Sequence, residues 1–481
     1  MNNTNSAIKK NLPFWILLIS AIFVLIIRDL FRDGMFMDGM IYTTVSKNLA
    51  NGLGTFWHPH FSQTFMQNYH EQPTLMFGIE ALFFKILGNG MYTERIYGLT
   101  IFLLSVFMII KIWNCIFQEQ TERNIKWLPL LFLLSIPICF WSYANNMEEP
   151  IMCLFTLCSV YFIYTAIILN KNIYLNLFVA GVMVIASSLC KGFQGLFPLG
   201  SIFLYWIIFR NISFKRMLIY SSILIAVVII FYALILLNKN IYHSFELYFN
   251  NRIIGTFMNP GSTHTNRFLI IEQLISKLIP FSILALSEGI FLWIKKKYVP
   301  VKKQEIKMAA WFFLIGLSGI LPLMVTKEQS DYYLVTGMPY IVMGIAILFI
   351  PSISALVNTI ETKSSKYKIG LSAISSILIA SIIFSIYTIV NIPKRDKEML
   401  HDIYITGETI KEGSIIGIPN EMWSDWSLHA YFDRYYYISL DASTKPHQFY
   451  LIDKKFNQKL VLEGYKEIEL PTQKYNLYKK I

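Results

Sequence analysis

The chain has 481 residues, of which 55% are hydrophobic and only 15% are charged, and its mean hydropathy is +0.48. An ordinary soluble domain is nearer one quarter charged, so this composition excludes a single water-soluble globular protein. The formal net charge of +12 does not indicate a nucleic-acid partner. The Lys and Arg residues gather in short connections between apolar runs, as in proteins oriented within a membrane.

Apolar runs long enough to cross a bilayer follow one another along most of the chain. A helix of roughly 18–25 apolar residues spans a hydrocarbon core of about 30 Å. We count about eleven such runs, which predicts an all-α polytopic membrane protein. In chain order the runs cover residues 12–27, 96–117, 127–144, 150–169, 173–190, 195–209, 217–237, 268–294, 308–326, 332–351 and 367–391.

One further apolar stretch, residues 74–88, is short, and Glu80 is one of two charged residues that interrupt it. A crossing there would put the lysine-rich loop 295–307 outside, against the preference of basic loops for the cytoplasm. We therefore expect an amphipathic helix lying along the membrane surface. The N-terminus and the 295–307 loop are then cytoplasmic, whereas the loop 28–95 faces outside.

The last part of the chain, 392–481, is charged and has alternating stretches at 435–440 and 449–452, a pattern typical of strands. About 90 residues can bury a modest core, so we predict a small soluble α/β domain outside the membrane. The chain then divides into a transmembrane domain, 1–391, which includes the first outside loop 28–95, and a C-terminal extracytoplasmic domain, 392–481.

The ionisable residues of the outside loops gather on one face of the membrane in this topology. They suit glycosyl transfer from a phosphate-linked sugar. An acceptor hydroxyl that attacks the anomeric carbon needs a base, which a carboxylate provides. The leaving phosphate needs cationic partners such as Lys, Arg or a metal. Outside residues of these types include Asp38, Glu71, Glu149, Lys191, Arg252, His264, Arg267 and Lys327.

Most of these candidates also have a purely structural interpretation. Asp38 lies among apolar residues, where an unpartnered carboxylate is costly to bury, and this favours a function. Glu71 precedes the surface helix, whose amino end suits a carboxylate, and Glu149 opens a span in the same way. Lys191 is also placed to anchor a span at the interface. His264 also fits an ordinary loop histidine.

Two segments of the first loop, 37–49 and 71–75, resemble the GT-C class of membrane glycosyltransferases. They are similar to the protein O-mannosyltransferases and the bacterial lipid A aminoarabinose transferases. Gly39 and Gln72 depart from that pattern, which often has Glu and Lys at these places. Further similar positions are Arg95, the stretch 146–155 with Glu149, Lys191-Gly192-Phe193 with Pro198, and Lys327 with Tyr332, Tyr333 and Pro339.

The resemblance implies a GT-C-like fold and inverting transfer of a sugar from a polyprenyl-phosphate donor. The acceptor would be a lipid, glycan or protein at the outer face of the cytoplasmic membrane. It further implies catalytic roles for Asp38, as the base, Glu71 and Glu149, and a divalent metal or the donor phosphate held by Glu71 and His264. The implied substrate-binding residues are Tyr42, Lys191, Arg252, Arg267, Lys327, Tyr332 and Tyr333.

Three other functions stay open. A transporter or flippase of lipid-linked sugars would place ionisable residues near the middle of spans, whereas most here lie near one face. A glycan polymerase or ligase with a similar lipid donor would also use outside histidine and arginine residues. A non-catalytic scaffold leaves the one-sided carboxylates unexplained.

Overall fold

The structure, a computed structural model, describes residues 2–255, 266–294, 300–326, 329–456 and 463–481. Contacts within the chain define two compact units. Unit 1 comprises Met1–Arg28, Leu99–Tyr143 and Glu148–Ile386. Unit 2 comprises Asp29–Gly98, Ala144–Met147 and Tyr387–Ile481.

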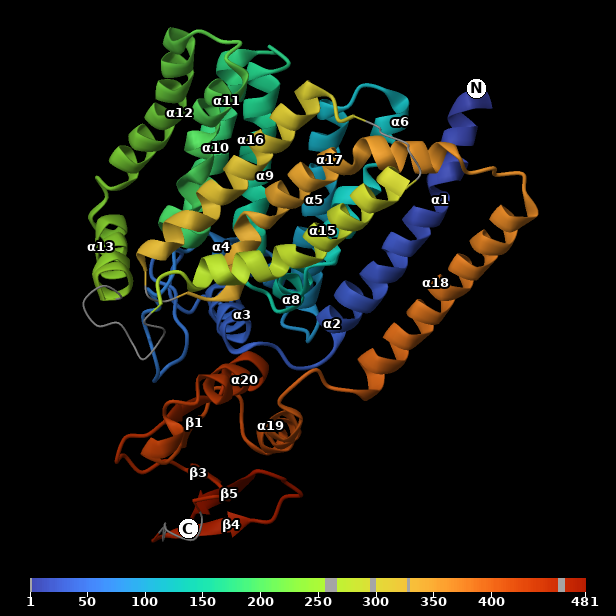
Figure 1. The fold of residues 1–481 in the computed structure, drawn as a ribbon. Helices are drawn as coiled ribbons and strands as arrows, with labels where there is room; N and C mark the ends of the chain where they lie inside the picture. Colours follow the sequence, from blue (N-terminus) through green and yellow to red (C-terminus); the bar gives the residue numbers. More distant parts are fainter. Residues whose placement is uncertain (1, 256–265, 295–299, 327–328, 457–462) are drawn as a thin grey trace. The chain divides into compact units, whose positions relative to one another are not determined.

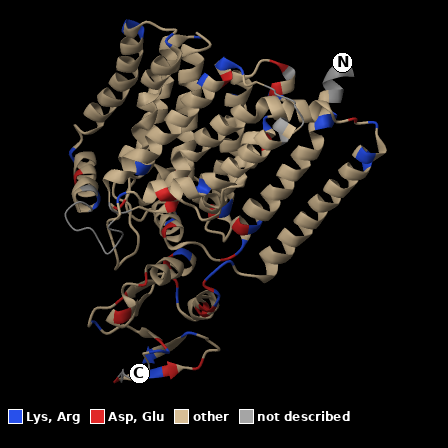
Figure 2. Cartoon of the chain, viewed as in Figure 1, with Lys and Arg blue, Asp and Glu red and all other residues tan. Residues whose placement is uncertain are grey.

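Unit 1 is built from helices (Figure 1), as expected for apolar segments whose backbone groups must bond internally where water is excluded. Along most of their length these helices carry few charged residues (Figure 2). The α-helices are α1 (Asn2–Ile22), α5 (Thr93–Ile116), α6 (Gln120–Arg123), α7 (Trp127–Leu134), α8 (Pro137–Ala144), α9 (Glu148–Ile167), α10 (Ile173–Lys191), α11 (Ser201–Phe209), α12 (Phe214–Ile235), α13 (Lys239–Tyr248), α15 (Leu269–Ile294), α16 (Lys303–Ile320), α17 (Met338–Asn358) and α18 (Ser365–Asn391). Shorter 3-10 and π segments are η1 (Phe23–Ile27), η2 (Gly192–Gly200), η3 (Phe249–Ile254), η4 (Leu321–Val325) and η5 (Asp331–Thr336).

Nine helices among the described residues are long and apolar enough to cross a membrane, or ten when the bent pair of α7 and α8 counts as one span. The prediction of a polytopic all-α protein is therefore confirmed. The count is below the expected eleven because two expected runs, 173–190 and 195–209, join in one 37-residue segment, Ile173–Phe209.

The direction of this long segment reverses within it. A Cβ added at Gly181 of α10 would meet Val227 of α12, and seven residues later the Ser188 hydroxyl lies 2.8 Å from that of Tyr232. Both contacts advance together along the two helices, so α10 and α12 run parallel. The chain between them must return, and η2 with α11 forms that return.

The expected run 127–144 is broken into α7 and α8, which meet at 83°. Ser135 is the C-cap residue of α7, and Pro137 begins α8. Proline lacks an N–H and its ring clashes with the preceding turn, so a helix breaks before it. This bend precedes the linker 144–147, which belongs to unit 2.

Unit 2 combines short helices with one five-stranded sheet of order β2-β1-β3-β5-β4. β1 pairs in parallel with β2 and β3, whereas β5 pairs antiparallel with β3 and β4. The predicted small α/β fold in the tail is confirmed. The elements are α2 (Arg28–Phe31), α3 (Met37–Ala50), α4 (Leu75–Leu87), α19 (Lys397–Thr409), η6 (Asn420–Met422), α20 (Trp426–Tyr436), β1 (Ile415–Gly417), β2 (Ser439–Asp441), β3 (Phe449–Asp453), β4 (Tyr465–Ile468) and β5 (Tyr475–Lys480).

Two local predictions in unit 2 have different outcomes. The stretch 74–88 forms α4, which has 13 residues and is not among the helices long enough to span a membrane. The strand expected at 435–440 is partly wrong, because Tyr435 and Tyr436 complete α20. Tyr437 ends that helix in the left-handed conformation with φ of 55°, so strand β2 begins only at Ser439.

The first loop and the tail pack together in unit 2. The Thr44 hydroxyl donates to the Ala430 carbonyl at 3.1 Å, and the Thr64 hydroxyl donates to the Leu440 carbonyl at 2.6 Å. Partners from the two ends of the chain therefore share one folded body, while the sequence-based domain boundary at 391/392 stays a prediction.

Candidate functional site

A buried ionic cluster in unit 1 forms where α9 begins and α10 ends. Glu148 and Glu149 open α9 and are fully buried, and the Lys191 ammonium pairs with Glu149 and lies 3.6 Å from Glu148. Gly192 ends α10 with φ of 68°, and a Cβ there would overlap the Tyr248 hydroxyl. Only glycine suits both the conformation and the space, so this turn fixes where Lys191 lies.

Two tyrosines flank the same lysine. The Lys191 ammonium lies 4.8 Å from the ring centre of Tyr333 and 5.8 Å from that of Tyr332, within the range of cation–π attraction. Gln194 holds this segment by donating to the Tyr333 carbonyl at 3.2 Å and to the Thr336 hydroxyl at 3.0 Å. The structure thus brings together four predicted site residues: Glu149, Lys191, Tyr332 and Tyr333.

The remaining predicted residues of unit 1 have different places. Arg252 lies in η3 within electrostatic reach of Tyr248, whose pKa burial raises to about 12, with Glu148 adding to the shift and Lys191 and Arg252 opposing it. Arg267 is exposed just before α15, and its carbonyl accepts a bond from Gln329. His264 and Lys327 lie outside the described residues.

Asp38 lies in the first turn of α3 in unit 2 and is half-buried. Negative side chains are stabilised at the amino end of a helix. Its neighbour Gly39 touches the linker so closely that a Cβ would overlap the Asn145 carbonyl oxygen. The departure from the family pattern at Gly39 therefore has a steric reason here. Tyr42, one turn further along, is buried with its ring 5.8 Å from that of Phe77.

Glu71 is half-buried and precedes α4, whose N-cap residue is Thr74. The nearby His70 is buried and its Nε2 lies 3.3 Å from Nδ1 of His58. Within the part of the chain that the structure describes, no three His, Cys, Asp or Glu side chains converge as metal ligands. The predicted pairing of Glu71 with His264 stays a prediction, since His264 falls outside that part.

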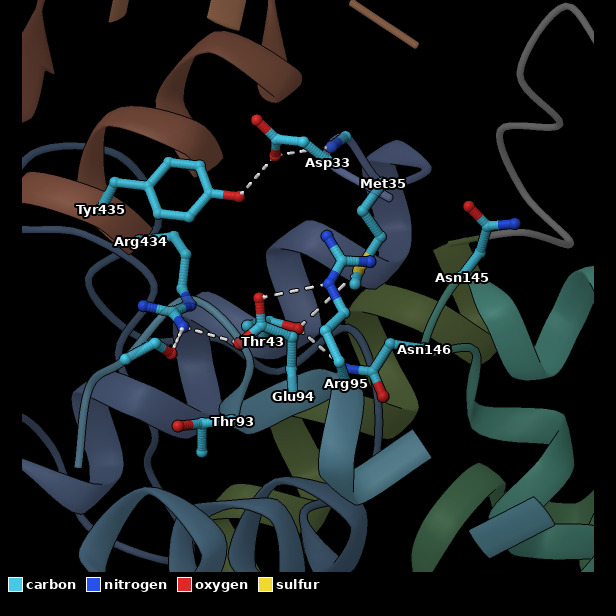
Figure 3. Close-up of polar contacts among 12 residues, drawn as sticks. Asp33, Met35, Thr43, Thr93, Glu94, Arg95, Asn145, Asn146, Arg434 and Tyr435 are labelled. Atoms are coloured by element: carbon cyan, nitrogen blue, oxygen red, sulfur yellow. Dashed lines mark hydrogen bonds and ion pairs between the residues drawn. The ribbon is translucent and has the colours of Figure 1, made fainter. Parts of the chain in front are cut away.

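A second ionic network in unit 2 joins the start of α5 to the tail helix α20 (Figure 3). The Arg434 guanidinium donates to the Glu94 carboxylate at 2.6 Å and to the carbonyls of Asn89 and Gly90 at 3.1 and 2.8 Å. Arg95 Nε lies 3.8 Å from the other oxygen of Glu94. Buried ion pairs hold their geometry only when further hydrogen bonds satisfy them, and the carbonyls provide these bonds to Arg434.

Glu80 lies beside this network in α4 and is fully buried. It accepts hydrogen bonds from Ser46 and Asn146, both at 2.8 Å, and lies 3.4 Å from the Thr43 hydroxyl. Burial raises the pKa of Glu80 to about 8, so its carboxyl is largely protonated at neutral pH. A neutral carboxyl here links α3, α4 and the linker 144–147.

Lys47 forms a third buried group, between α3 and α20. Its ammonium donates to the carbonyls of Asp433 and Arg434, and lies 3.9 Å from the Asp433 carboxylate. Burial lowers the pKa of Lys47 to about 7, although Asp433 opposes the shift. This lysine holds α20 against α3.

Comparisons with known proteins identify the fold. Residues 71–235 match the family model for Dolichyl-phosphate-mannose-protein mannosyltransferase. ArnT from Cupriavidus metallidurans, in the structure bound to undecaprenyl phosphate, has a TM-score of 0.64 at 11% identity, and the alignment covers 97% of this chain and 98% of that chain. The chain has the GT-C fold. The apo structure of the same ArnT has a TM-score of 0.61. A search of curated sequences finds no match.

A second GT-C structure with this fold is the archaeal oligosaccharyltransferase AglB from Archaeoglobus fulgidus, in complex with an inhibitory peptide and a dolichol-phosphate. Its TM-score is 0.50 at 11% identity, covering 93% of this chain and 70% of that chain. The resemblance noted from the first loop is thereby confirmed at the level of the GT-C fold.

Four of the buried groups described above were not among the predicted site residues: Lys47, Glu80, Glu94 and Arg434. The sequence could have indicated Glu80 as a candidate, because a carboxylate inside an apolar run is costly to bury without partners. The same reasoning had singled out Asp38. Arg434 carried no such signal, since it lies in a charged part of the tail.

Proposed function

We propose that this protein transfers a sugar from a polyprenyl-phosphate-linked donor to a lipid, glycan or protein acceptor at the outer face of the cytoplasmic membrane. The observation that carries the proposal is the convergence of Glu149, Lys191, Tyr332 and Tyr333 in one buried cluster. A buried ammonium with aromatic walls suits a phosphate in apolar surroundings, where electrostatic interactions are much stronger than in water.

The lipid nature of the donor is supported by the comparisons. ArnT with this fold is bound to undecaprenyl phosphate, and AglB is in complex with a dolichol-phosphate. The family model that matches residues 71–235 is described by a dolichyl-phosphate-linked mannose. A polyprenyl phosphate is the chemistry that these proteins have in common.

The proposed reaction forms one bond and breaks one bond at the anomeric carbon. The acceptor oxygen attacks that carbon as its proton passes to the Asp38 carboxylate, which acts as a general base. The bond to the phosphate oxygen breaks, and the polyprenyl phosphate leaves with the electron pair. A single displacement of this kind inverts the configuration of the sugar.

Lys191 is the proposed partner of the leaving phosphate. An ammonium has three N–H donors, so Lys191 is able to bond a phosphate oxygen while Glu149 and Glu148 hold it in place. Arg252, Arg267 and Lys327 are further proposed partners of the phosphate or the sugar, and Tyr42 is proposed to line the sugar site.

A divalent metal at Glu71 and His264 is a separate proposal. A carboxylate oxygen and an imidazole nitrogen suit zinc or a similar ion, which would stabilise charge on the donor phosphate. The reaction above uses no step that depends on it. Measuring transfer after dialysis against a chelator, with and without added zinc or magnesium, tests this proposal alone.

The decisive experiment gives the purified full-length protein a panel of polyprenyl-phosphate sugars and analyses the products. We expect one donor to be consumed, with free polyprenyl phosphate and a glycosylated acceptor formed in equal amounts. Glu149→Gln serves as the matched loss-of-site variant. Movement of an intact lipid-linked sugar across vesicles without cleavage would replace the transferase with a flippase.

A further inference from the structure

The segment before Asp38 has no regular structure of its own. Helix α2 ends at Phe31 and α3 begins at Met37, so the backbone groups of residues 32–36 must find partners elsewhere. Several of those partners come from the tail. Lys394 N–H donates to the Asp33 carbonyl at 2.7 Å, which places the tail directly against the strip of chain that carries Asp38.

Tyr431 of α20 contacts the backbone of Met35, three residues before Asp38. Its hydroxyl accepts a bond from Met35 N–H at 2.9 Å and lies 3.0 Å from the Met35 carbonyl and from Asp396. The Tyr431 side chain is fully buried. One hydroxyl therefore fixes both backbone groups of a residue three positions before Asp38.

Lys394 reaches the same strip through the linker. Its ammonium nitrogen donates to the Asn145 side-chain oxygen at 2.8 Å and to the Ala144 carbonyl at 3.1 Å. The same Asn145 oxygen accepts from Phe36 N–H at 3.0 Å. Burial lowers the pKa of Lys394 well below its usual range, yet a neutral amine still donates. The contact of Gly39 with the Asn145 carbonyl completes the arrangement.

We propose that Tyr431 and Lys394 are positioning residues that set the place of Asp38 for the transfer reaction. The inference rests on the proposed function, in which Asp38 is the base. Hydrogen bonds to Met35 and Phe36 hold the backbone before Asp38. The close approach of Gly39 to the Asn145 carbonyl restricts the backbone after it. Tyr431 of the tail bonds Met35 directly, and Lys394 acts on Phe36 through Asn145. A base must lie within about 2.6–3.2 Å of the proton that it takes. A misplacement of about 1 Å costs on the order of a hundredfold in rate.

The test is Tyr431→Phe in the full-length protein, which removes the hydroxyl and leaves the ring. We expect kcat to fall roughly tenfold to a hundredfold while KM for the polyprenyl-phosphate sugar is unchanged. Tyr436→Phe is the matched control. It removes a hydroxyl of the same helix that donates to the Tyr404 carbonyl at 3.3 Å, away from the segment 32–36, and it should keep the wild-type kcat.

A double variant separates positioning from a general structural role. If Tyr431 acts through Asp38, adding Tyr431→Phe to Asp38→Asn should cause no further loss of the residual rate. A further loss equal to that of the single variant would overturn the proposal. Lys394→Met provides the same comparison if Tyr431→Phe does not fold.

The activity of Asp38→Asn distinguishes a failure of the proposed base from a failure of the positioning role. Substantial activity of Asp38→Asn would remove the proposed base. A nearly inactive Asp38→Asn together with a wild-type kcat for both Tyr431→Phe and Lys394→Met would remove the positioning role alone.

Discussion

The two units differ in what their buried ionisable groups do. In unit 1, Lys191 faces two buried carboxylates and the charges are kept as ion pairs. Unit 2 keeps one such pair, Glu94 with Arg434, but burial there also lowers the pKa of Lys47 to about 7 and raises that of Glu80 to about 8, so both groups approach neutrality near pH 7. Groups that lose their charge are suited to holding a shape and not to binding a charged substrate.

The partners also differ in their separation along the chain. Glu149 and Lys191 are 42 residues apart and lie on neighbouring helices of unit 1. Lys47 and the Asp433 carbonyl are 386 residues apart. The Glu149–Lys191 ion pair depends on one helix pair, whereas the Lys47 contact depends on the two ends of the chain folding together. Unit 2 also holds Asp38, whose proposed role as the base would make it an exception to the structural role of the buried groups described there.

The largest expected effect concerns that exception. Asp38→Asn should lower kcat by roughly 10²–10⁴-fold, the usual cost of losing a general base. Membrane insertion and thermal stability should stay close to wild type, because asparagine has the same shape. Turnover of purified variant with the best donor from the panel measures this. A variant that retains more than about a tenth of the wild-type rate would show that Asp38 is not the base.

The charge kept in unit 1 is tested by Lys191→Met. Removing the ammonium leaves Glu148 and Glu149 buried without this cation, which should cost about 3–5 kcal/mol in the free energy of unfolding. Adding Glu149→Gln should recover part of that loss without restoring transfer. Thermal unfolding of both variants in detergent measures the difference. Equal stability of Lys191→Met and wild type would contradict the ionic interpretation of the cluster.

The neutral state of Glu80 in unit 2 is tested by Glu80→Gln and pH. The folded-state pKa of about 8 exceeds the ordinary value of 4.5, so the folded state binds the extra proton between these values. Wild-type stability is then lost progressively as pH rises through this window, and the glutamine variant lacks that loss. The melting temperature of Glu80→Gln relative to wild type should therefore increase from pH 5 to pH 8.5. A constant difference across this range would show that Glu80 is ionised in the folded protein.

The smallest expected effect concerns orientation and not activity. Lys303 begins α16 beside the basic loop that is expected to face the cytoplasm. Lys303→Cys should leave turnover unchanged and react with a membrane-impermeant thiol reagent only after the cells are permeabilised. Tail positions such as Lys454→Cys should react in intact cells. Labelling of Lys303→Cys from outside would invert the topology and the placement of the reaction.

Much of unit 1 could be predicted from the sequence because a helix in apolar surroundings bonds only to itself. Run length and hydropathy then determine its elements, with Pro137 accounting for the break between α7 and α8. The cluster around Lys191 could also be predicted in part, since few charged residues lie at the ends of the spans. The return through η2 also agrees with the sequence, which separates the runs 173–190 and 195–209 at this point.

The network of unit 2 was not predictable in this way. Arg434 and Glu94 are 340 residues apart, and nothing in either local pattern indicates that they meet. Tyr435 and Tyr436 are adjacent aromatic residues of a type that is common in strands, yet they end helix α20. Both features depend on contacts between distant parts of the chain, and no local pattern in a single sequence reveals such contacts.

The 340 residues between Glu94 and Arg434 also impose an order on synthesis. A ribosome that adds roughly 5–20 residues per second needs about 20 s to a minute to make this interval. During that time the first loop has already emerged, but the helix that supplies Arg434, Tyr431 and the Asp433 carbonyl does not yet exist. The first loop can therefore reach its final structure only when translation is almost finished, and a ribosome that stops early leaves a membrane protein with its spans inserted and its reaction centre unmade.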